Sequence, residues 1–146
     1  MQYELNLIHD LCRAIGFAGY YQTPEIFAIP LAEGIVLVFQ NSESEKDCLV
    51  AFEGTPWHCH GDFQFSDRHG YFLELSYLDV IKGLGAGSIL LCEQWNSGVL
   101  RDRWLVHRDY IDEFRYMVEG EDIRIRRLPA GFHSASIEQA ANEKQA

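Results

Sequence analysis

The hydrophobic positions near the start of the chain repeat with a helical period. They follow one another at spacings of three and four residues, which places them on one side of a helix. This apolar stripe consists of Leu5, Ile8, Cys12 and Ile15. Gly16 comes directly afterwards, and glycine is the usual residue just beyond a helix end. We therefore predict a helix over residues 3–15 that packs its stripe against the rest of the fold.

Between the first helix and residue 53 the pattern changes to short apolar runs separated by polar or turn residues. Residues 26–29, 34–40 and 48–53 are rich in β-branched and other apolar side chains, which favours strands. The run 34–40 is uninterrupted and is the best candidate for a central strand. The polar segment 41–47 is typical of a hairpin connection. We expect these runs to pair as antiparallel strands.

Residues 57–66 alternate in character as a single half-buried strand does. One face of that strand carries Trp57, Cys59, Phe63 and Phe65. The other face carries His58, His60, Asp62, Gln64 and Ser66. This pattern has two interpretations: a strand with its polar face in water, or a metal or ligand site built on that face.

The second half of the chain predicts another helix, a hairpin and a final strand. Ser76 and Asp79 are the expected capping pair at the start of a helix over residues 76–84. Further elements are expected at 71–75 (a strand), 88–95 and 99–107 (a hairpin), 109–118 (a short helix) and 121–128 (a strand).

Together these elements predict an α+β fold in a single domain over residues 1–130. It consists mainly of an antiparallel sheet of about six or seven strands, with an N-terminal helix and one or two further helices. Residues 131–146 are expected to form a weakly structured C-terminal tail. A chain of 146 residues is long enough for one domain with a real core and too short for two ordinary domains.

The formal net charge of −10 changes which partners are expected. Residues 1–60 contain two basic and eight acidic side chains (net −6), and residues 61–146 contain ten and fourteen (net −4). Attraction between basic side chains and phosphates drives binding to nucleic acids and anionic membranes, so we expect no nucleic acid and no membrane as partner. A basic protein is the partner that the charge favours.

The cysteines and the N-terminal segment favour a cytoplasmic protein. No two of the four cysteines have Cys-x-x-Cys spacing, and all lie within apolar runs, which is typical of free buried thiols in a reducing compartment. They are Cys12, Cys48, Cys59 and Cys92. The N-terminal segment is acidic where a signal peptide would be basic. No stretch approaches the roughly 20 apolar residues of a membrane span.

His58, His60 and Asp62 form a His-x-His-x-Asp motif that is suited to metal binding. Residues two apart in a strand point to the same side, about 6.6 Å apart, which lets two imidazoles share one ion. Asp62 would be a third ligand or the acceptor that orients a histidine. Candidates for a further ligand from a neighbouring strand are His69, Glu74, Glu93, His107 and His133. We expect no cofactor, and a divalent metal such as zinc is the alternative that these residues suggest.

Four arginines form a second candidate site for a ligand or partner. Arg101 and Arg103 share one side of their strand, and Arg124 and Arg126 share one side of another. If the two strands are neighbours, these side chains form a basic patch that can bind carboxylate or phosphate. The alternative is cross-strand pairing with the acids Glu93, Asp102, Glu119 and Glu121. Trp57 is a candidate anchor, because tryptophan is favoured at binding sites.

These features support two functions. The first is a small acidic protein that binds a partner protein without catalysis. In size and charge the chain resembles immunity proteins, and that resemblance implies an inhibitor of a basic toxin. The alternative is a metal-binding protein or metal-dependent enzyme that uses His58, His60 and Asp62. Nucleophilic catalysis is disfavoured, because Cys59 lies on the apolar face without a base and no Gly-x-Ser-x-Gly motif occurs. The sequence leaves the oligomeric state open.

Overall fold

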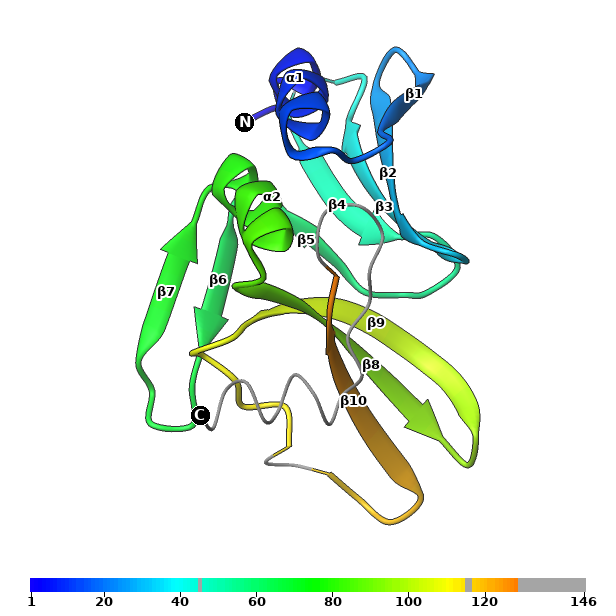
Figure 1. The fold of residues 1–146 in the computed structure, drawn as a ribbon, viewed down its shortest axis with the longest axis vertical. Coiled ribbons are helices and arrows are strands. Elements are labelled where there is room, and N and C mark those ends of the chain that lie inside the picture. The colour runs from blue at the N-terminus through cyan, green and yellow to red at the C-terminus, as the bar shows by residue number, and fades with distance from the viewer. Residues whose placement is uncertain (45, 115–116, 129–146) are drawn as a thin grey trace.

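The computed structural model describes residues 1–44, 46–114 and 117–128, and in these residues it shows two helices and three antiparallel sheets (Figure 1). The predicted α+β fold class is confirmed. The helices are α1 (Leu5–Ile15) and α2 (Tyr77–Ala86). The strands are β1 (Tyr20–Thr23), β2 (Ile26–Ala32), β3 (Ile35–Asn41), β4 (Cys48–Phe52), β5 (His58–His60), β6 (Phe63–Ser66), β7 (Phe72–Leu75), β8 (Ile89–Asn96), β9 (Val99–His107) and β10 (Glu121–Arg127). The predicted tail at 131–146 lies outside the described residues.

The first five strands form one sheet, in which each strand pairs antiparallel with the next along the chain. Side chains alternate between its two faces, because successive residues of a strand point to opposite sides. One face carries Phe27, Ile29, Leu37, Phe39 and Val50, all of them fully buried. These side chains share one hydrophobic core with residues of α1 and α2, so both helices lie on this face of the sheet.

Both helices begin or end at the residues that the sequence marks. Gly16 adopts φ 101°, a left-handed conformation that suits glycine, and its N–H donates to the carbonyl of Cys12 at 2.8 Å. Three of the four stripe residues of α1 are buried. At the start of α2 the N–H of Asp79 donates to Ser76 Oγ at 3.2 Å, which is the predicted cap.

The central strand of the three-stranded sheet is β8, with β9 on one side and β10 on the other. Ile89, Leu91 and Leu105 of this sheet join the main core. The opposite face of the sheet buries a second hydrophobic cluster, which contains Leu90, Cys92, Val106, Ile123 and Ile125. The hairpin β6–β7 makes up the two-stranded third sheet. The main core therefore lies where the five-stranded sheet, both helices and one face of the three-stranded sheet meet.

Residues 57–66 form two strands of different sheets, where the sequence predicts one continuous strand. β5 ends at His60, Gly61 adopts φ 72°, and β6 begins at Phe63. A left-handed residue changes the direction of the chain, and the alternating pattern does not show that change because it continues through the turn. This break is one reason why the strands outnumber the expected six or seven.

The short helix predicted at 109–118 is not formed in its described residues, which make turns and irregular structure. Two of its apolar side chains, Phe114 and Val118, are 50% and 62% exposed. A short helix is stable only when one face is buried against other elements, and these side chains bury too little to provide that.

The segment before α1 is held by hydrogen bonds around Asn41, a buried polar residue at the end of β3. Asn41 Oδ1 accepts from the backbone N–H of Tyr3 at 2.7 Å, and Asn41 Nδ2 donates to the carbonyl of Tyr3 at 2.9 Å. Tyr3 Oη donates to the carbonyl of Gly61 at 2.8 Å, and the N–H of Glu4 donates to Tyr77 Oη at 3.0 Å. These contacts join the N-terminal segment to β3, to the β5–β6 connection and to α2.

We expect Asn41→Leu to lower the free energy of unfolding by about 2–4 kcal/mol, because it leaves the N–H and the carbonyl of Tyr3 buried without partners. Urea unfolding followed by tryptophan fluorescence measures the loss. Gln40→Leu is the matched control, because Gln40 is the preceding residue of the same strand and is exposed. The control should change stability by less than about 0.5 kcal/mol. Equal losses in the two variants would contradict the role of Asn41.

Candidate functional site

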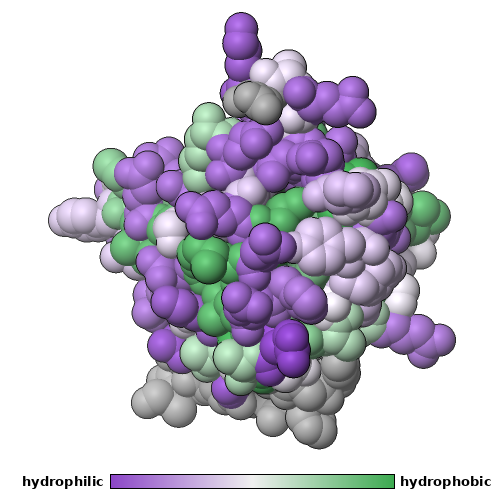
Figure 2. Space-filling model, turned by 90° about the horizontal axis from the view of Figure 1, so that it is seen from above, coloured by the Kyte–Doolittle hydropathy of each residue, from purple (hydrophilic) through white to green (hydrophobic). Residues whose placement is uncertain are grey.

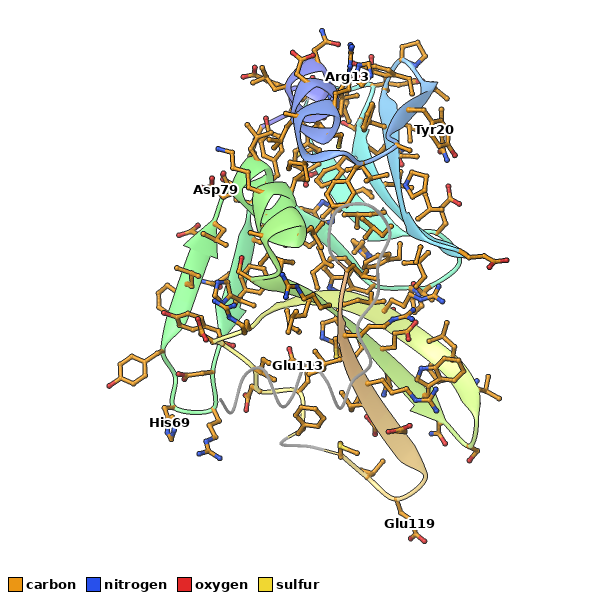
Figure 3. The ribbon with its side chains drawn as sticks, in the orientation of Figure 1. Arg13, Tyr20, His69, Asp79, Glu113 and Glu119 are labelled. Carbon is orange, nitrogen blue, oxygen red and sulfur yellow. The ribbon has the colours of Figure 1, made fainter. Side chains whose placement is uncertain are left out.

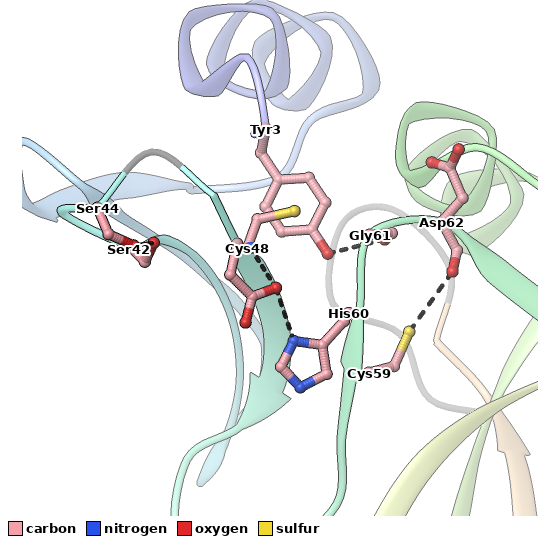
Figure 4. A network of polar contacts seen from close by, with 9 residues as sticks. Tyr3, Ser42, Ser44, Cys48, Cys59, His60, Gly61 and Asp62 are labelled. Carbon is pink, nitrogen blue, oxygen red and sulfur yellow. Dashed lines mark hydrogen bonds and ion pairs between the residues drawn. The ribbon is translucent and has the colours of Figure 1, made fainter. Parts of the chain in front are cut away.

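The two histidines of the predicted metal motif lie next to each other on β5, the edge strand of the five-stranded sheet. His58 and His60 are both exposed, and their ring centroids are 5.2 Å apart. His60 Nδ1 lies 2.9 Å from Asp47 Oδ1, so the acid beside this histidine comes from the segment before β4 (Figure 4). This hydrogen bond, together with one from the N–H of Cys48, lowers the pKa of the Asp47 carboxyl group.

Asp62, the third predicted ligand, lies at a different place in the fold. The turn at Gly61 directs it to the start of α2, where Asp62 Oδ1 accepts from the N–H of Tyr77 at 3.1 Å. In the described ranges no three His, Cys, Asp or Glu side chains are grouped so that they could hold a metal ion. The structure thus brings His58 and His60 together and separates Asp62 from them.

The other candidate ligands are dispersed. His69 lies at the tip of the β6–β7 hairpin, where Figure 3 labels it, and Glu74 lies on β7. Glu93 is buried on β8, and His107 ends β9. His133 lies outside the described residues.

Cys59 and Trp57 face the core. Cys59 Sγ donates to the carbonyl of Asp62 at 3.7 Å, and burial, with a smaller effect of the Asp62 charge, raises the pKa of the Cys59 thiol to about 11. A thiol with that pKa is protonated at neutral pH and is a poor nucleophile. The indole of Trp57 packs against Phe52 and Phe63, with ring centroids 5.9 and 6.4 Å away. Trp57 therefore contributes to packing at the margin of the core.

The two arginine-bearing strands do not pair with each other, because β8 lies between them. Arg103 and Arg124 both stand opposite Glu93 in the strand register, so these three side chains share one face of the sheet. Arg103 Nε donates to Glu93 Oε2 at 2.8 Å, and Arg126 Nη2 lies 3.8 Å from Glu93 Oε1. Arg103, Arg124 and Arg126 therefore share one face of the sheet with Glu93, and binding of a ligand or partner there stays a prediction. Arg101 is exposed and lies at the register shift between β8 and β9, so alternation does not place it on that face.

The sequence motifs miss one surface, the face of the five-stranded sheet that points away from the helices. We call it the outer face. Along β2 to β5 it carries Ile26, Ala28, Pro30, Val36, Val38, Gln40, Leu49, Ala51, His58 and His60. Ala28 is fully buried, and the others are half-buried or exposed. Strand pairing places Ala28, Val38, Ala51 and His58 in one row. Neither hydrophobic cluster of the described residues contains any residue of the outer face.

The composition of the outer face is unusual for its position. When an antiparallel sheet has one face in solvent, that face is normally polar. Here Val36, Val38 and Leu49 are only partly buried and stand beside further apolar residues. The signal in the sequence is the run 35–39, in which every residue is apolar, so both faces of β3 are apolar. Half-buried apolar side chains therefore stand where a solvent-facing sheet surface usually carries polar ones.

Acidic residues dominate the segments that connect the strands of this sheet. Residues 20–60 contain six acids and one base. These are Glu25, Glu33, Glu43, Glu45, Asp47 and Glu53, against Lys46. All of the described ones are exposed. Seen from above, the end of the molecule that carries α1 and the β1–β2 hairpin shows mainly hydrophilic residues with hydrophobic ones between them (Figure 2).

Comparison with known proteins assigns no family to this chain, because no family model matches it and no curated protein or solved structure shows significant similarity to it. No helix in the described part of the chain is long and apolar enough to cross a membrane.

We expect His60→Ala to raise the pKa of the Asp47 carboxyl group toward its ordinary value of 3.8, because the hydrogen bond from His60 is the largest cause of its lowering. Since this pKa is lower in the folded state, the pair stabilises the fold above pH 3.8, and that contribution is lost as the pH falls through the folded-state pKa. Carbon-13 NMR titration of Asp47 measures the shift. His58→Ala, at the adjacent histidine, should leave the Asp47 pKa unchanged, and an equal effect of both variants would contradict the assignment.

We also expect purified, untagged protein to contain no stoichiometric zinc and to melt at the same temperature with and without a chelator. The reason is that no third protein ligand in the described ranges converges on His58 and His60. Elemental analysis and thermal unfolding provide the measurements. Stoichiometric zinc that disappears in the double variant His58→Ala and His60→Ala would instead establish a metal site.

Proposed function

We propose that this protein acts without catalysis, by binding a basic partner protein through the outer face of its five-stranded sheet. The observation that carries the proposal is the group of half-buried apolar residues Val36, Val38, Leu49 and Ala51 on a sheet face that neither hydrophobic cluster of the described residues includes. Burial of such a surface against a partner contributes roughly 25 cal/mol per Å² of apolar area.

The charge of the molecule supports a basic partner. The connections of the same sheet carry six acids and one base, and the whole chain has a net charge of −10. Acidic side chains at the margin of an apolar centre attract a basic protein during encounter and disfavour acidic competitors. The arrangement matches the usual anatomy of an interface, in which an apolar centre is surrounded by polar residues.

The chemistry of the other candidate residues supports a non-catalytic role. In the described ranges the metal motif lacks a third ligand, and burial keeps the Cys59 thiol protonated. The likeness in size and charge to immunity proteins supports an inhibitor of a basic toxin, which acts in the cytoplasm. Such an inhibitor needs a complementary surface and no reactive group.

The test compares the wild-type chain with Val38→Arg, which places a positive charge in the centre of the outer face. A partner captured by the wild type is purified and its dissociation constant is measured by calorimetry at low and high salt. We expect a basic partner, weaker binding at high salt, and a further loss of about 2–3 kcal/mol in Val38→Arg, roughly 30- to 150-fold in the dissociation constant.

Lys82→Glu is the control, because Lys82 is exposed on α2, away from the outer face. It should bind the partner as the wild type does. Partner binding that Val38→Arg leaves intact would refute the role of the outer face. A wild-type homodimer that Val38→Arg converts to a monomer in sedimentation would assign this face to a second copy of the chain and overturn the proposal.

A further inference from the structure

The two histidines of β5 lie at the margin of the outer face. Strand register places His58 opposite Ala51 and His60 opposite Leu49, so both imidazoles stand beside half-buried apolar residues of that face. Both histidines are exposed, and their ring centroids are 5.2 Å apart. Asp47, one residue before β4, contacts the ring of His60. We call His58, His60 and Asp47 together the histidine margin.

Hydrogen bonds determine which nitrogen of each ring carries the proton. His60 Nδ1 lies 2.9 Å from Asp47 Oδ1 (Figure 4), and His58 Nδ1 lies 3.3 Å from the carbonyl oxygen of Pro56. The contact with His60 lowers the pKa of the Asp47 carboxyl group, so that group is ionised at neutral pH. An ionised carboxylate and a carbonyl oxygen can only accept, so Nδ1 is the donor in both rings.

Each ring therefore presents its other nitrogen as an acceptor. A neutral imidazole with its proton on Nδ1 has a lone pair on Nε2. In Figure 4 the Nε2 atom of His60 lies on the side of the ring away from the dashed contact. Asp47 uses Oδ1 both for His60 and for the N–H of Cys48, so its Oδ2 takes part in neither bond. The side chains of His60 and Asp47 are 51% and 55% exposed, which leaves these atoms open to a partner.

The histidine margin thus offers acceptors and negative charge, while the ring N–H donors are already used within the protein. Lysine and arginine side chains complement such a surface, because they carry only donors and a positive charge. Their aliphatic stems can also pack on apolar residues such as Leu49 and Ala51 while the charged end reaches the margin. Carboxylate side chains carry only acceptors, so this surface disfavours them.

We propose that the histidine margin recognises lysine or arginine side chains of the partner, through Nε2 of His58, Nε2 of His60 and the carboxylate of Asp47. This inference rests on the proposed function, because it names the groups by which the outer face would select a basic partner. Each acceptor can take a separate donor, so the three need not converge on one group. The two histidines of the sequence motif then have a role that requires no metal ion.

The test uses the full nitrogen-15-labelled chain at pH 8, at which an ordinary imidazole group is neutral. Long-range proton–nitrogen spectra identify the tautomer of each ring, and we expect Nδ1–H in both. The chain is then titrated with amidated tetra-lysine and tetra-arginine peptides, with sodium chloride at equal ionic strength as the reference. We expect saturable shifts of the Nε2 signals of His58 and His60, and the tighter peptide identifies the preferred side chain.

His58→Phe and His60→Phe should each weaken peptide binding about threefold, because each keeps an aromatic ring and removes the acceptor. His58→Gln and His60→Gln should bind as the wild type does, since the amide oxygen of glutamine can accept near the place of Nε2. This rescue separates recognition from a structural role of the ring. His69→Phe is the matched control, because His69 is an exposed histidine in the β6–β7 hairpin.

Four results would overturn the proposal. They are protons on Nε2 in both free rings, shifts that do not saturate or that chloride reproduces, losses in the Gln variants equal to those in the Phe variants, and an equal loss in His69→Phe. The first would remove the acceptors. The others would mean that the peptides respond only to the overall charge or to the shape of the ring.

Failure of this inference is distinguishable from failure of the proposed function, because the peptide titration does not need the partner protein. Tetrapeptides that do not bind, with a basic partner whose binding Val38→Arg weakens, would refute the histidine margin and keep the proposed function. Peptide binding at His58 and His60, with partner binding that Val38→Arg leaves intact, would keep the recognition of basic side chains and refute the outer face as the interface.

Discussion

The hydrogen bonds between Asn41 and the backbone of Tyr3 are the interaction on which the rest of the arrangement depends. One buried amide satisfies both the N–H and the carbonyl of a segment that belongs to no helix or strand. The ring of Tyr3 packs edge-to-face on Phe39, at 5.2 Å between centroids, and lies 4.7 Å from the ring of Tyr77. The same few residues therefore hold α1, β3 and α2 together. By placing both helices on one face of the five-stranded sheet, they leave the other face as the outer face.

Two further polar contacts join the five-stranded sheet to the three-stranded one. Asp102 Oδ1 accepts from the N–H of Trp57 at 2.9 Å, and Arg103 reaches the carbonyl of Gly34 while its Nε bonds to Glu93. Arg103 thus belongs both to the connection between the sheets and to the face of the three-stranded sheet that carries Glu93.

The sequence by itself determined the elements whose signals are local. The helix at α1 follows from an apolar stripe with Gly16 behind it, and the start of α2 follows from Ser76 and Asp79, because caps and helical periodicity act over three or four residues. The hairpin β8–β9 and the α+β class follow in the same way from runs and turns. The shared side of Arg124 and Arg126 on one strand could also be expected, since alternation along a strand is a local property. Their position beside Glu93 depends on how the strands pair.

Only the tertiary structure decided which of these residues meet. The alternation through residues 57–66 continues across the turn at Gly61, so it could not reveal that Asp62 leaves the histidines and binds the start of α2. The uniformly apolar run of β3 likewise could not reveal that its outer face would lie outside both hydrophobic clusters of the described residues. The burial of a face depends on contacts between distant segments, such as that of Tyr3 with Asn41, which are 38 residues apart. No pattern within either segment specifies such a contact, because its free energy arises only when both segments are packed together.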